Sequence, residues 1–444
     1  MRMKTYSYGQ IWKIAFPVLI SVLMEQLVGM TDTAFLGRVG EVELGASALG
    51  SIFYIAVFVL GMGLGTGAQI LMGRRNGEGL FHEVGNLFYH SLLLLVVVAA
   101  VLFTFVQAFA PWVLDQMISS PAVYAAACDY VEWRVFGFFF AYIAIMFRAF
   151  YIATTQTKTL TLNSVLMVVS NIFFNYVLIF GKFGFPALGI SGAAIGSVMA
   201  EAVSMLFFLL YTRYRMDYKK YGLNLRPHFR PHFLGRIMSI SIWTMVQNFL
   251  SLGTWFFFFL AVEHLGEREL AVSNIIRNIS SFFYMTLSAM ASTASTLVSN
   301  LMGQGEMEAV LPMINKTLKL VFYIIIPMGI LVAIFPEWVL AIYTDDAALI
   351  VAGVAPLFVL LSSYVFTVPQ RIYLSATMGT GNTLRALWIE ILSLLVYVVF
   401  IYTVIYLYKA PLWVCWFSEY VYGFPSMLLA WMYMRSNKWQ TKVL

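Results

Sequence analysis

The chain has 444 residues, of which 61% are hydrophobic and 11% are charged. Soluble domains carry about 45–50% apolar and about 25% charged residues, so this composition excludes an ordinary soluble protein. The formal net charge is +6, but the cations are spread over loops between apolar segments, and no groove-reading motif accompanies them. We therefore expect a membrane protein without a nucleic-acid partner.

Twelve apolar segments follow one another along the chain. A membrane-spanning helix needs roughly 20 mainly apolar residues, and segments of about this length recur from end to end. The predicted fold is an all-α integral membrane protein with twelve transmembrane helices. Their expected limits are 11–34, 46–72, 86–110, 124–150, 160–181, 190–212, 235–262, 270–299, 313–336, 348–376, 384–408 and 411–434.

The distribution of positive charge predicts the orientation. The basic start of the chain (MRMK, 1–4) precedes a long span without a small-residue cleavage site, which indicates a first transmembrane helix and not a signal peptide. Positive residues are retained on the cytoplasmic side. Most of the 27 lysines and arginines become cytoplasmic when the N-terminus is inside, and both termini are then cytoplasmic; examples are Arg2, Lys4, Arg226 and Lys442.

One long hydrophilic connection divides the twelve segments six and six. It runs over 213–231 and contains Pro227-His228 and Pro231-His232. The halves share three local matches at nearly constant separation: GEVEL (40–44) with GEREL (266–270), RAFYIAT (148–154) with RIYLSAT (371–377), and Glu201 with Glu419. We predict two parallel six-helix repeats around a central cleft, with lobes 1–218 and 235–444 and a cytoplasmic linker 219–234. Two such bundles can rock against each other and open the cleft to one side at a time. We expect a monomer.

Several segments together carry a family pattern. Pro17 and Gln26 accompany the run MTDTAFLGRVG (30–40), and the next helix contains GMGLGTGAQ, which ends at Gln69. Further segments are NIFFN (171–175), GKFGFPALGISGAAIG (181–196), LVSNLMGQG (297–305) and MGTGNT (378–383). Over essentially its whole length the chain resembles the bacterial type of the multidrug and toxic-compound extrusion (MATE) family.

This resemblance implies a secondary antiporter in the bacterial cytoplasmic (inner) membrane. Such a protein exports bulky, often cationic or amphiphilic compounds by alternating access, in exchange for protons or sodium ions, and needs no cofactor besides the ion gradient. Flippases for lipid-linked precursors share the twelve-helix core. The chain has no extra helices and no strongly cationic central segment, which favours a drug exporter over a flippase.

Acidic residues within the apolar segments are candidate coupling groups, because an ionisable side chain at bilayer depth is costly unless it is paired or hydrated. Asp32 lies in the family run and is seven residues from Glu25, which places both on nearly the same helix face. Burial favours the neutral form of a carboxyl group. We expect Asp32 to carry the coupling proton; the alternative is a solvent-exposed cap at the end of the helix.

Polar partners for these acids are also present. A buried guanidinium needs a carboxylate or carbonyl partner, so Arg148 is expected to hold an acid of the first half and Arg371 one of the second. Alternatively both reach the cytoplasmic boundary. Asn171 and Asn175 lie one turn apart, and either contribute to a proton or cation site with Asp32 or only join helices by hydrogen bonds.

Departures from the family pattern bear on the coupling ion. Some relatives hold sodium in the second half through acids at positions that align with Ser251 and Thr367, and neither residue is charged. Other relatives have a second aspartate where this chain has Asn175. We therefore expect proton coupling through Asp32, with sodium bound at Asp32 and Asn175 as the alternative.

The expected substrate contacts are acidic, polar and cationic side chains within the helices. A carboxylate beside aromatic rings attracts lipophilic cations, although the aromatic residues around Glu419 also fit an interfacial belt. The residues assigned to substrate are Glu201, Glu419, Gln69, Gln370 and Arg371. The five histidines show no metal-ligand spacing and no nucleophile motif accompanies them, so we expect neither a metal site nor an enzyme.

Overall fold

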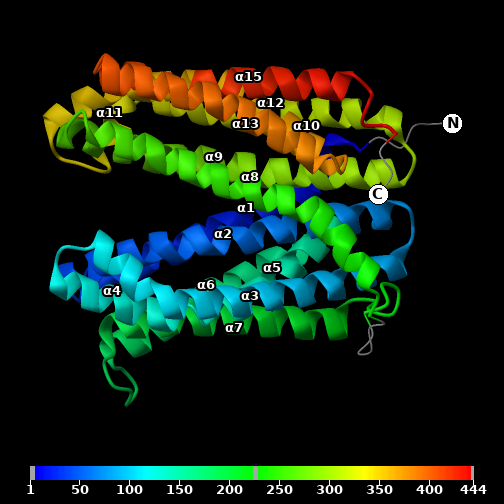
Figure 1. The fold of residues 1–444 in the computed structure, drawn as a ribbon, viewed down its shortest axis with the longest axis horizontal. Coiled ribbons are helices and arrows are strands. Elements are labelled where there is room, and N and C mark those ends of the chain that lie inside the picture. Colours follow the sequence, from blue (N-terminus) through cyan, green and yellow to red (C-terminus); the bar gives the residue numbers. More distant parts are fainter. Residues whose placement is uncertain (1–5, 224–228, 442–444) are drawn as a thin grey trace. The chain divides into compact units, whose positions relative to one another are not determined.

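The structure, a computed structural model, describes residues 6–223 and 229–441, and its regular elements there are all helices. Arg2, Lys4, Arg226, His228 and Lys442 lie outside the described residues. The helices, most of them labelled in Figure 1, are α1 (Tyr8–Leu36), α2 (Glu41–Gly77), α3 (Phe81–Met117), α4 (Pro121–Arg134), α5 (Gly137–Ala153), α6 (Lys158–Phe180), α7 (Gly189–Arg215), α8 (Pro231–Glu263), α9 (Glu267–Gly303), η1 (Met307–Ala309), α10 (Val310–Ile334), α11 (Pro336–Ala341), α12 (Ala347–Gly379), α13 (Thr383–Ile401), η2 (Tyr402–Leu407), α14 (Leu412–Cys415) and α15 (Ser418–Arg435).

The twelve predicted segments all coincide with helices, which confirms the fold class. In the described part of the chain, nine helices are long and apolar enough to cross a membrane, and α4 with α5 forms a tenth candidate. The other two predicted segments, 270–299 and 411–434, correspond to α9 and to α14 with α15. These two segments are too polar to count as candidate membrane spans by hydropathy; α9, for example, is rich in Ser, Thr and Asn.

The fourth predicted segment, 124–150, is not one continuous helix. The chain bends by 49° between α4 and α5. Gly137 begins α5, and a Cβ at this position would overlap both the Arg134 guanidinium and the Glu201 carboxylate. The break therefore makes room for a polar contact inside an apolar helix pair, and hydropathy alone does not reveal it.

Two compact units make up the chain. One contains Phe16–Met245, and the other contains the residues up to Ala15 together with those from Val246 onward. The changes of unit thus fall inside α1 and α8. The lobes 1–218 and 235–444 and the linker 219–234 stay a prediction. They are defined by a repeat in the sequence, whereas the two compact units are defined by packing.

Close packing in the Phe16–Met245 unit explains the glycine-rich segment of α2. A Cβ at Gly61 would overlap the Tyr142 ring, and one at Gly67 would overlap Ser241 in the first part of α8. The Thr244 hydroxyl donates to the Gly63 carbonyl oxygen over 2.6 Å. Small residues let helix backbones approach closely in membranes, so these glycines serve helix packing.

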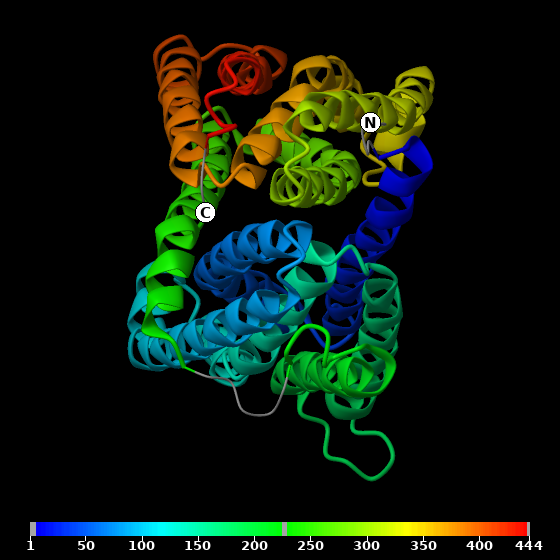
Figure 2. The ribbon, with the colours of Figure 1, turned by 90° about the vertical axis from the view of Figure 1, so that its right-hand side faces the viewer.

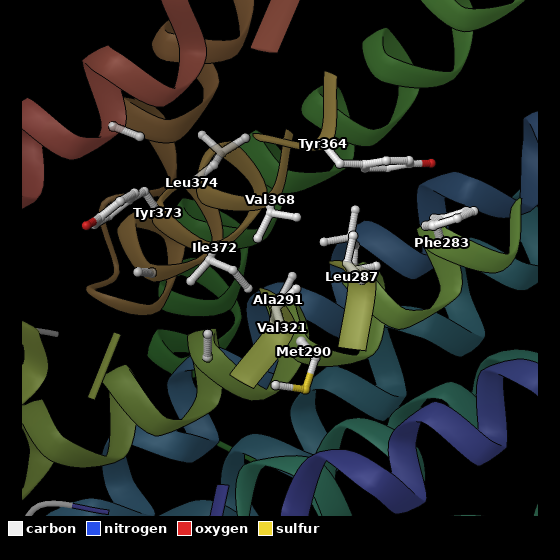
Figure 3. Close-up of a cluster of buried hydrophobic side chains, with 14 of the residues drawn as sticks. Phe283, Leu287, Met290, Ala291, Val321, Tyr364, Val368, Ile372, Tyr373 and Leu374 are labelled. Carbon is white, nitrogen blue, oxygen red and sulfur yellow. The ribbon is translucent and has the colours of Figure 1, made fainter. Parts of the chain in front are cut away.

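The unit that begins at Val246 has its own apolar core. Phe283, Leu287 and Met290 of α9 pack with Val321 of α10 and with α12 residues such as Ile372, as the close-up in Figure 3 shows. Phe283 also stacks on Tyr364 of α12, with ring centroids 4.8 Å apart. This core keeps α12 in place, and α12 carries Gln370 and Arg371 of the predicted substrate contacts.

The connection between α6 and α7 extends beyond the ends of both helices, as Figure 2 shows in green. Gly181 ends α6 in the left-handed conformation, with φ of 65°. Residues with a Cβ rarely adopt this conformation. The glycines of the family-like run 181–196 therefore turn the chain back, and α7 can pack against α6.

His90 of α3 holds the segment just before α8 by a hydrogen bond. Its side chain is buried; its Nδ1 lies 2.6 Å from the Asn86 carbonyl oxygen, and its Nε2 accepts the Arg230 backbone N–H over 2.9 Å. The partners indicate a neutral ring that donates from Nδ1. Rings of Phe229 and Phe233 lie on it, with centroids 5.6 and 5.3 Å away.

We expect His90→Ala to loosen this attachment. A lost buried hydrogen bond costs about 1–3 kcal/mol, and roughly 1.4 kcal/mol corresponds to a tenfold change in the opened population that a protease cleaves. Chymotrypsin should therefore cut after Phe229 about tenfold faster. The matched control is His264→Ala, because His264 also bonds the carbonyl oxygen four residues earlier but has no bond to a second segment among the described residues. Equal cleavage of both variants would contradict the role of His90.

Candidate functional site

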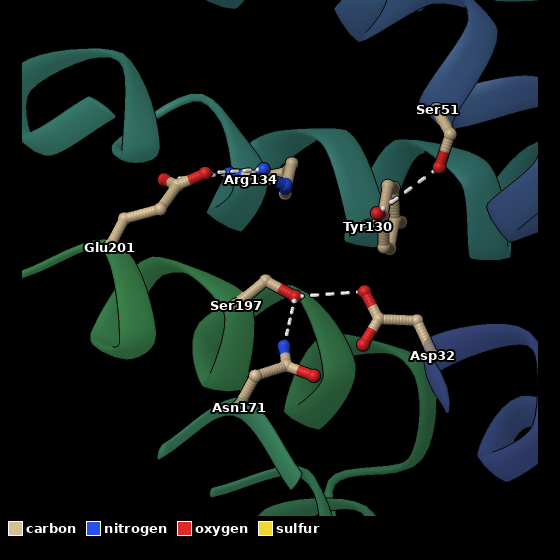
Figure 4. Close-up of polar contacts among 7 residues, drawn as sticks. All are labelled: Asp32, Ser51, Tyr130, Arg134, Asn171, Ser197 and Glu201. Atoms are coloured by element: carbon tan, nitrogen blue, oxygen red, sulfur yellow. Dashed lines mark hydrogen bonds and ion pairs between the residues drawn. The ribbon is translucent and has the colours of Figure 1, made fainter. Parts of the chain in front are cut away.

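Asp32 lies in a polar cluster formed by α1, α6 and α7. Asn175 of α6 donates from Nδ2 to Asp32 Oδ1 over 2.5 Å, and Ser197 of α7 donates to Oδ2 over 3.0 Å. Asn171 donates to the Ser197 hydroxyl over 3.2 Å, as Figure 4 shows. Asp32 therefore bonds side chains of two other helices, although it is only four residues from the end of α1.

The two asparagines lie side by side because they are four residues apart on α6, and both are fully buried. Gly196 of α7 provides the space, since a Cβ there would overlap Asn175 Oδ1. Within the described residues this oxygen has no hydrogen-bond donor. The cluster thus combines one carboxyl group, neutral donors and one unsatisfied acceptor.

A second polar group, next to the Asp32 cluster in Figure 4, is the ion pair of Arg134 and Glu201. Arg134 donates from Nη1 to Oε2 over 3.0 Å and from Nη2 to Oε1 over 2.6 Å. Its guanidinium carbon also lies 4.1 Å from the centroid of the Tyr54 ring. A fork-shaped pair with both oxygens engaged is among the strongest charged contacts. Substrate contact by Glu201 stays a prediction, and any cation there has to compete with Arg134.

One face of α7 connects the two groups. Ser197 and Glu201 are four residues apart, so both point to the same side. The charges of Arg134 and Glu201 both act on Asp32, one attracting and one repelling its carboxylate. Neither Arg134 nor Ser197 is among the site residues predicted from the sequence. Spacing on α7 could have found Ser197, but nothing in the sequence indicates that Arg134 meets Glu201.

Glu25 and Arg148 form an ion pair between α1 and α5. This agrees with the expectation that Arg148 holds an acid of the first half. The Glu25 side chain is 46% exposed, and its partner lies on another helix than those of Asp32. The structure therefore does not bring Glu25 and Arg148 into the Asp32 cluster, although Glu25 and Asp32 share a helix.

The remaining predicted residues occupy other surroundings. Gln69 is buried in α2, within the unit that holds Asp32. In the other unit, Gln370 donates to the Tyr422 and Ser426 hydroxyls over 3.4 and 3.2 Å. Arg371 lies over the Tyr284 ring at 5.0 Å, and no ion pair joins it to a carboxylate among the described residues. The expectation that Arg371 directly holds an acid is therefore not met.

Arg371 interacts electrostatically with two acids beyond ion-pair distance. Its charge interacts with Glu390 and Glu419, which lie on α13 and α15. Arg148 and Arg371 occupy corresponding places in the two series of six predicted segments, and so do Glu201 and Glu419. The corresponding residues have different partners: Glu201 pairs with Arg134 and Arg148 with Glu25, whereas neither Arg371 nor Glu419 forms an ion pair among the described residues.

The MatE family model matches the chain twice, over residues 17–177 and 244–403. A probable multidrug resistance protein NorM from Thermotoga maritima is 26% identical over 389 residues, covering 86% of this chain and 82% of that protein. The multidrug resistance protein NorM of Photobacterium profundum is 23% identical over 390 residues, covering 86% and 83%.

Solved structures share the fold. A MOP superfamily transporter from Pyrococcus furiosus has a TM-score of 0.90 at 18% identity, over 98% of this chain and 97% of that one. A eukaryotic MATE transporter, AtDTX14, has a TM-score of 0.86 at 18% identity, over 97% and 96%. The two matches of the family model also follow the duplicated order of segments that the sequence predicts.

Proposed function

Because this chain belongs to the MatE family of multidrug efflux transporters, we propose that it exports bulky cationic or amphiphilic compounds in exchange for protons, and that Asp32 carries the coupling proton. Members of this family are transporters and not enzymes. The observation that supports the proposal is the Asp32 cluster: a carboxyl group with both oxygens hydrogen-bonded, enclosed by α6 and α7.

The groups around Asp32 favour a proton. Asp32 is the one carboxyl group in the cluster; its direct partners are an amide and a hydroxyl. A proton on Asp32 removes a charge whose burial is costly. The resulting hydroxyl has an acceptor nearby, since Asn175 Oδ1 lacks a donor among the described residues. Sodium coordinated by Asp32 and Asn175 is the second candidate, because both supply oxygen atoms.

Helix α1 connects this site to a conformational change in the proposal. Pro17 lies inside α1 and lacks the N–H that would complete the helical hydrogen bonds, which permits bending. The helix passes from one compact unit to the other between Ala15 and Phe16, next to this proline. Neutralising Asp32 weakens the bonds from Asn175 and Ser197, and α1 can then adopt a second packing that changes which side the substrate site faces.

The proposal includes the remaining predicted features. The protein works as a monomer in the bacterial inner membrane, with both termini in the cytoplasm. Its substrate contacts include Glu201, Gln69, Glu419, Gln370 and Arg371. Curated relatives named as multidrug resistance proteins support a small-molecule substrate.

Purified protein in lipid vesicles provides the test. We expect efflux of a fluorescent organic cation to require an imposed proton gradient and to stop when that gradient is collapsed. An imposed sodium gradient alone should drive no efflux. Efflux driven only by sodium would assign the Asp32 cluster to sodium, and absence of efflux under both gradients would favour a lipid-precursor flippase.

A further inference from the structure

A basic cavity lies where α13 begins and α15 ends. Its volume is about 540 Å³, and two cations, Arg385 and Lys438, line it. The neutral side chains around them that can form hydrogen bonds are Asn382, Tyr433, Ser436 and Thr441. Among the described residues that line it there is no aspartate or glutamate. Helices α13 and α15 pack against each other (Figure 1), so the whole cavity belongs to one compact unit.

The two cations of the cavity have no counter-charge in the described part of the protein. No ion pair joins Arg385 or Lys438 to a carboxylate there. Arg385 lies in the first turn of α13, where the helix dipole favours acids and disfavours cations. This turn has no acid, and Asn382 forms no side-chain cap hydrogen bond. Two positive side chains and a positive helix end therefore meet at one cavity, a combination that attracts an anion.

The fold holds both sides of the cavity in place. Asn382 donates from Nδ2 to the Tyr433 hydroxyl, which joins the start of α13 to the end of α15. After α15 the chain turns at Asn437, which has φ of 55°; asparagine adopts this left-handed conformation more readily than most residues. Trp439 is fully buried, and its Nε1 donates to a backbone carbonyl oxygen of α15 over 2.7 Å. Lys438, next to Trp439, is therefore part of an anchored turn.

Exposed apolar side chains continue from the cavity along both helices. Met432 lines the cavity, and Leu428 lies four residues earlier on the same face of α15. On α13, Trp388 and Leu392 share a face with Arg385, at spacings of three and then four residues. Exposed apolar surface of this kind marks contact with a membrane or a partner. A ligand with an anionic head in the cavity and hydrocarbon chains along these helices matches both parts.

We propose that this cavity binds the phosphate group of an anionic phospholipid, with Arg385 and Lys438 as the charged contacts. A guanidinium can donate two parallel N–H bonds to a phosphate, and such charged hydrogen bonds are strong. Basic pockets between transmembrane helices on the cytoplasmic side bind lipid head groups of this kind. A zwitterionic phospholipid fits less well, because its ammonium group meets two cations and no acid.

This inference goes beyond the proposed export and does not depend on proton exchange. Both termini are proposed to be cytoplasmic, and the lipid then belongs to the cytoplasmic leaflet. Binding itself can be measured on the purified protein, without a gradient and without a defined orientation. Failure of the proposed function in transport assays therefore leaves the lipid site to be judged by its own experiment.

Native mass spectrometry of the purified full-length protein measures lipid binding directly. We expect phosphatidylglycerol to bind at lower concentrations than phosphatidylcholine. In the double variant Arg385→Gln/Lys438→Gln, the concentration of phosphatidylglycerol that half-saturates the protein should rise about tenfold or more, since two charge-assisted contacts are lost. The matched control is Arg435→Gln/Lys319→Gln, which removes two exposed cations that do not line the cavity. This control should keep the wild-type affinity.

A second pair of variants leaves both cations in place. Ser436→Glu puts a carboxylate at an exposed position of the cavity lining and should weaken phosphatidylglycerol binding, whereas Ser436→Gln, of similar size, should not. Melting curves without lipid report whether each variant is folded. Because a ligand that binds the folded state stabilises it, phosphatidylglycerol should raise the melting temperature of the wild type and of Ser436→Gln, but not that of Ser436→Glu.

Several results would overturn the assignment. Wild-type affinity in Arg385→Gln/Lys438→Gln or in Ser436→Glu would remove the cavity as the binding site. An equal loss in Arg435→Gln/Lys319→Gln would show a general attraction by charges at the membrane surface, and equal binding of phosphatidylcholine would remove the preference for an anionic lipid.

Soluble phosphates separate a lipid from a free anion. Inorganic phosphate and glycerol phosphate carry the same charged group without acyl chains, and at millimolar concentration neither should displace phosphatidylglycerol or raise the melting temperature. Displacement by either compound would assign the cavity to a soluble phosphate ligand and overturn the lipid proposal.

Discussion

Replacement of Asp32 by asparagine is expected to abolish gradient-driven export while the protein stays folded. Asparagine has nearly the same volume as aspartate; its one side-chain oxygen can accept from Asn175 and its NH₂ group can donate to the Ser197 hydroxyl, the two groups that donate to the Asp32 carboxylate oxygens. It cannot take up a proton, so the change of charge that biases α1 is lost. Export should fall to the level of empty vesicles, and substrate binding should persist.

Efflux from vesicles at a series of external pH values measures this effect. The matched control is Asp345→Asn, which makes the same chemical change at an exposed residue before α12. Its export and pH dependence should match the wild type. If Asp32→Asn exports at the wild-type rate with unchanged pH dependence, Asp32 is not the coupling group, and Glu25 or Glu201 becomes the next candidate.

The second large effect concerns stability and involves the pair of Arg134 and Glu201. Their side chains are only 13% and 9% exposed. Removing one partner of a buried pair leaves the other charge uncompensated, which costs about 3–5 kcal/mol. Glu201→Gln and Arg134→Gln should therefore each lower the thermal stability of the purified protein strongly. Changing both removes both charges, so the double variant should lose less than the sum of the single losses.

Glu25→Gln is the control for this experiment, because Glu25 pairs with Arg148 but is 46% exposed. Exposed pairs contribute only about 0–1 kcal/mol, so its melting temperature should stay close to that of the wild type. Similar losses in Glu25→Gln and Glu201→Gln would show that the buried Arg134 pair contributes no more to stability than the exposed Glu25 pair. Strictly additive losses in the double variant would show that Arg134 and Glu201 do not stabilise each other.

Much of the fold could be predicted from local sequence because the surrounding bilayer restricts which backbone structures can form. In a bilayer every backbone polar group must be satisfied internally, so a long apolar run has to be helical. This is why twelve predicted segments all correspond to helices. The family resemblance in runs such as 30–40 and 171–175 is confirmed by the family model, which matches residues 17–177 and 244–403. The bend after Arg134 was not predictable, since its cause lies in Glu201, a residue of another helix.

The candidate site could be predicted only in part. Asp32, Asn171 and Asn175 stand out as polar residues within apolar segments, and the fold brings these three together. Glu25 resembles them in sequence but bonds Arg148 of α5 instead. A helical period relates residues of the same helix, and it does not indicate which neighbouring helix each of them faces.

The sequence alone therefore determined the membrane class, the order of helices, the family and the candidate acids, because these depend on composition and local spacing. Only the tertiary structure decided the partners: Asp32 with Ser197, Arg134 with Glu201, and Ser251 with Glu390. Each of these contacts joins residues more than 60 positions apart. Whether a buried acid is paired, hydrogen-bonded or unsatisfied depends on which helices pack together, and that packing sets the cost of its charge.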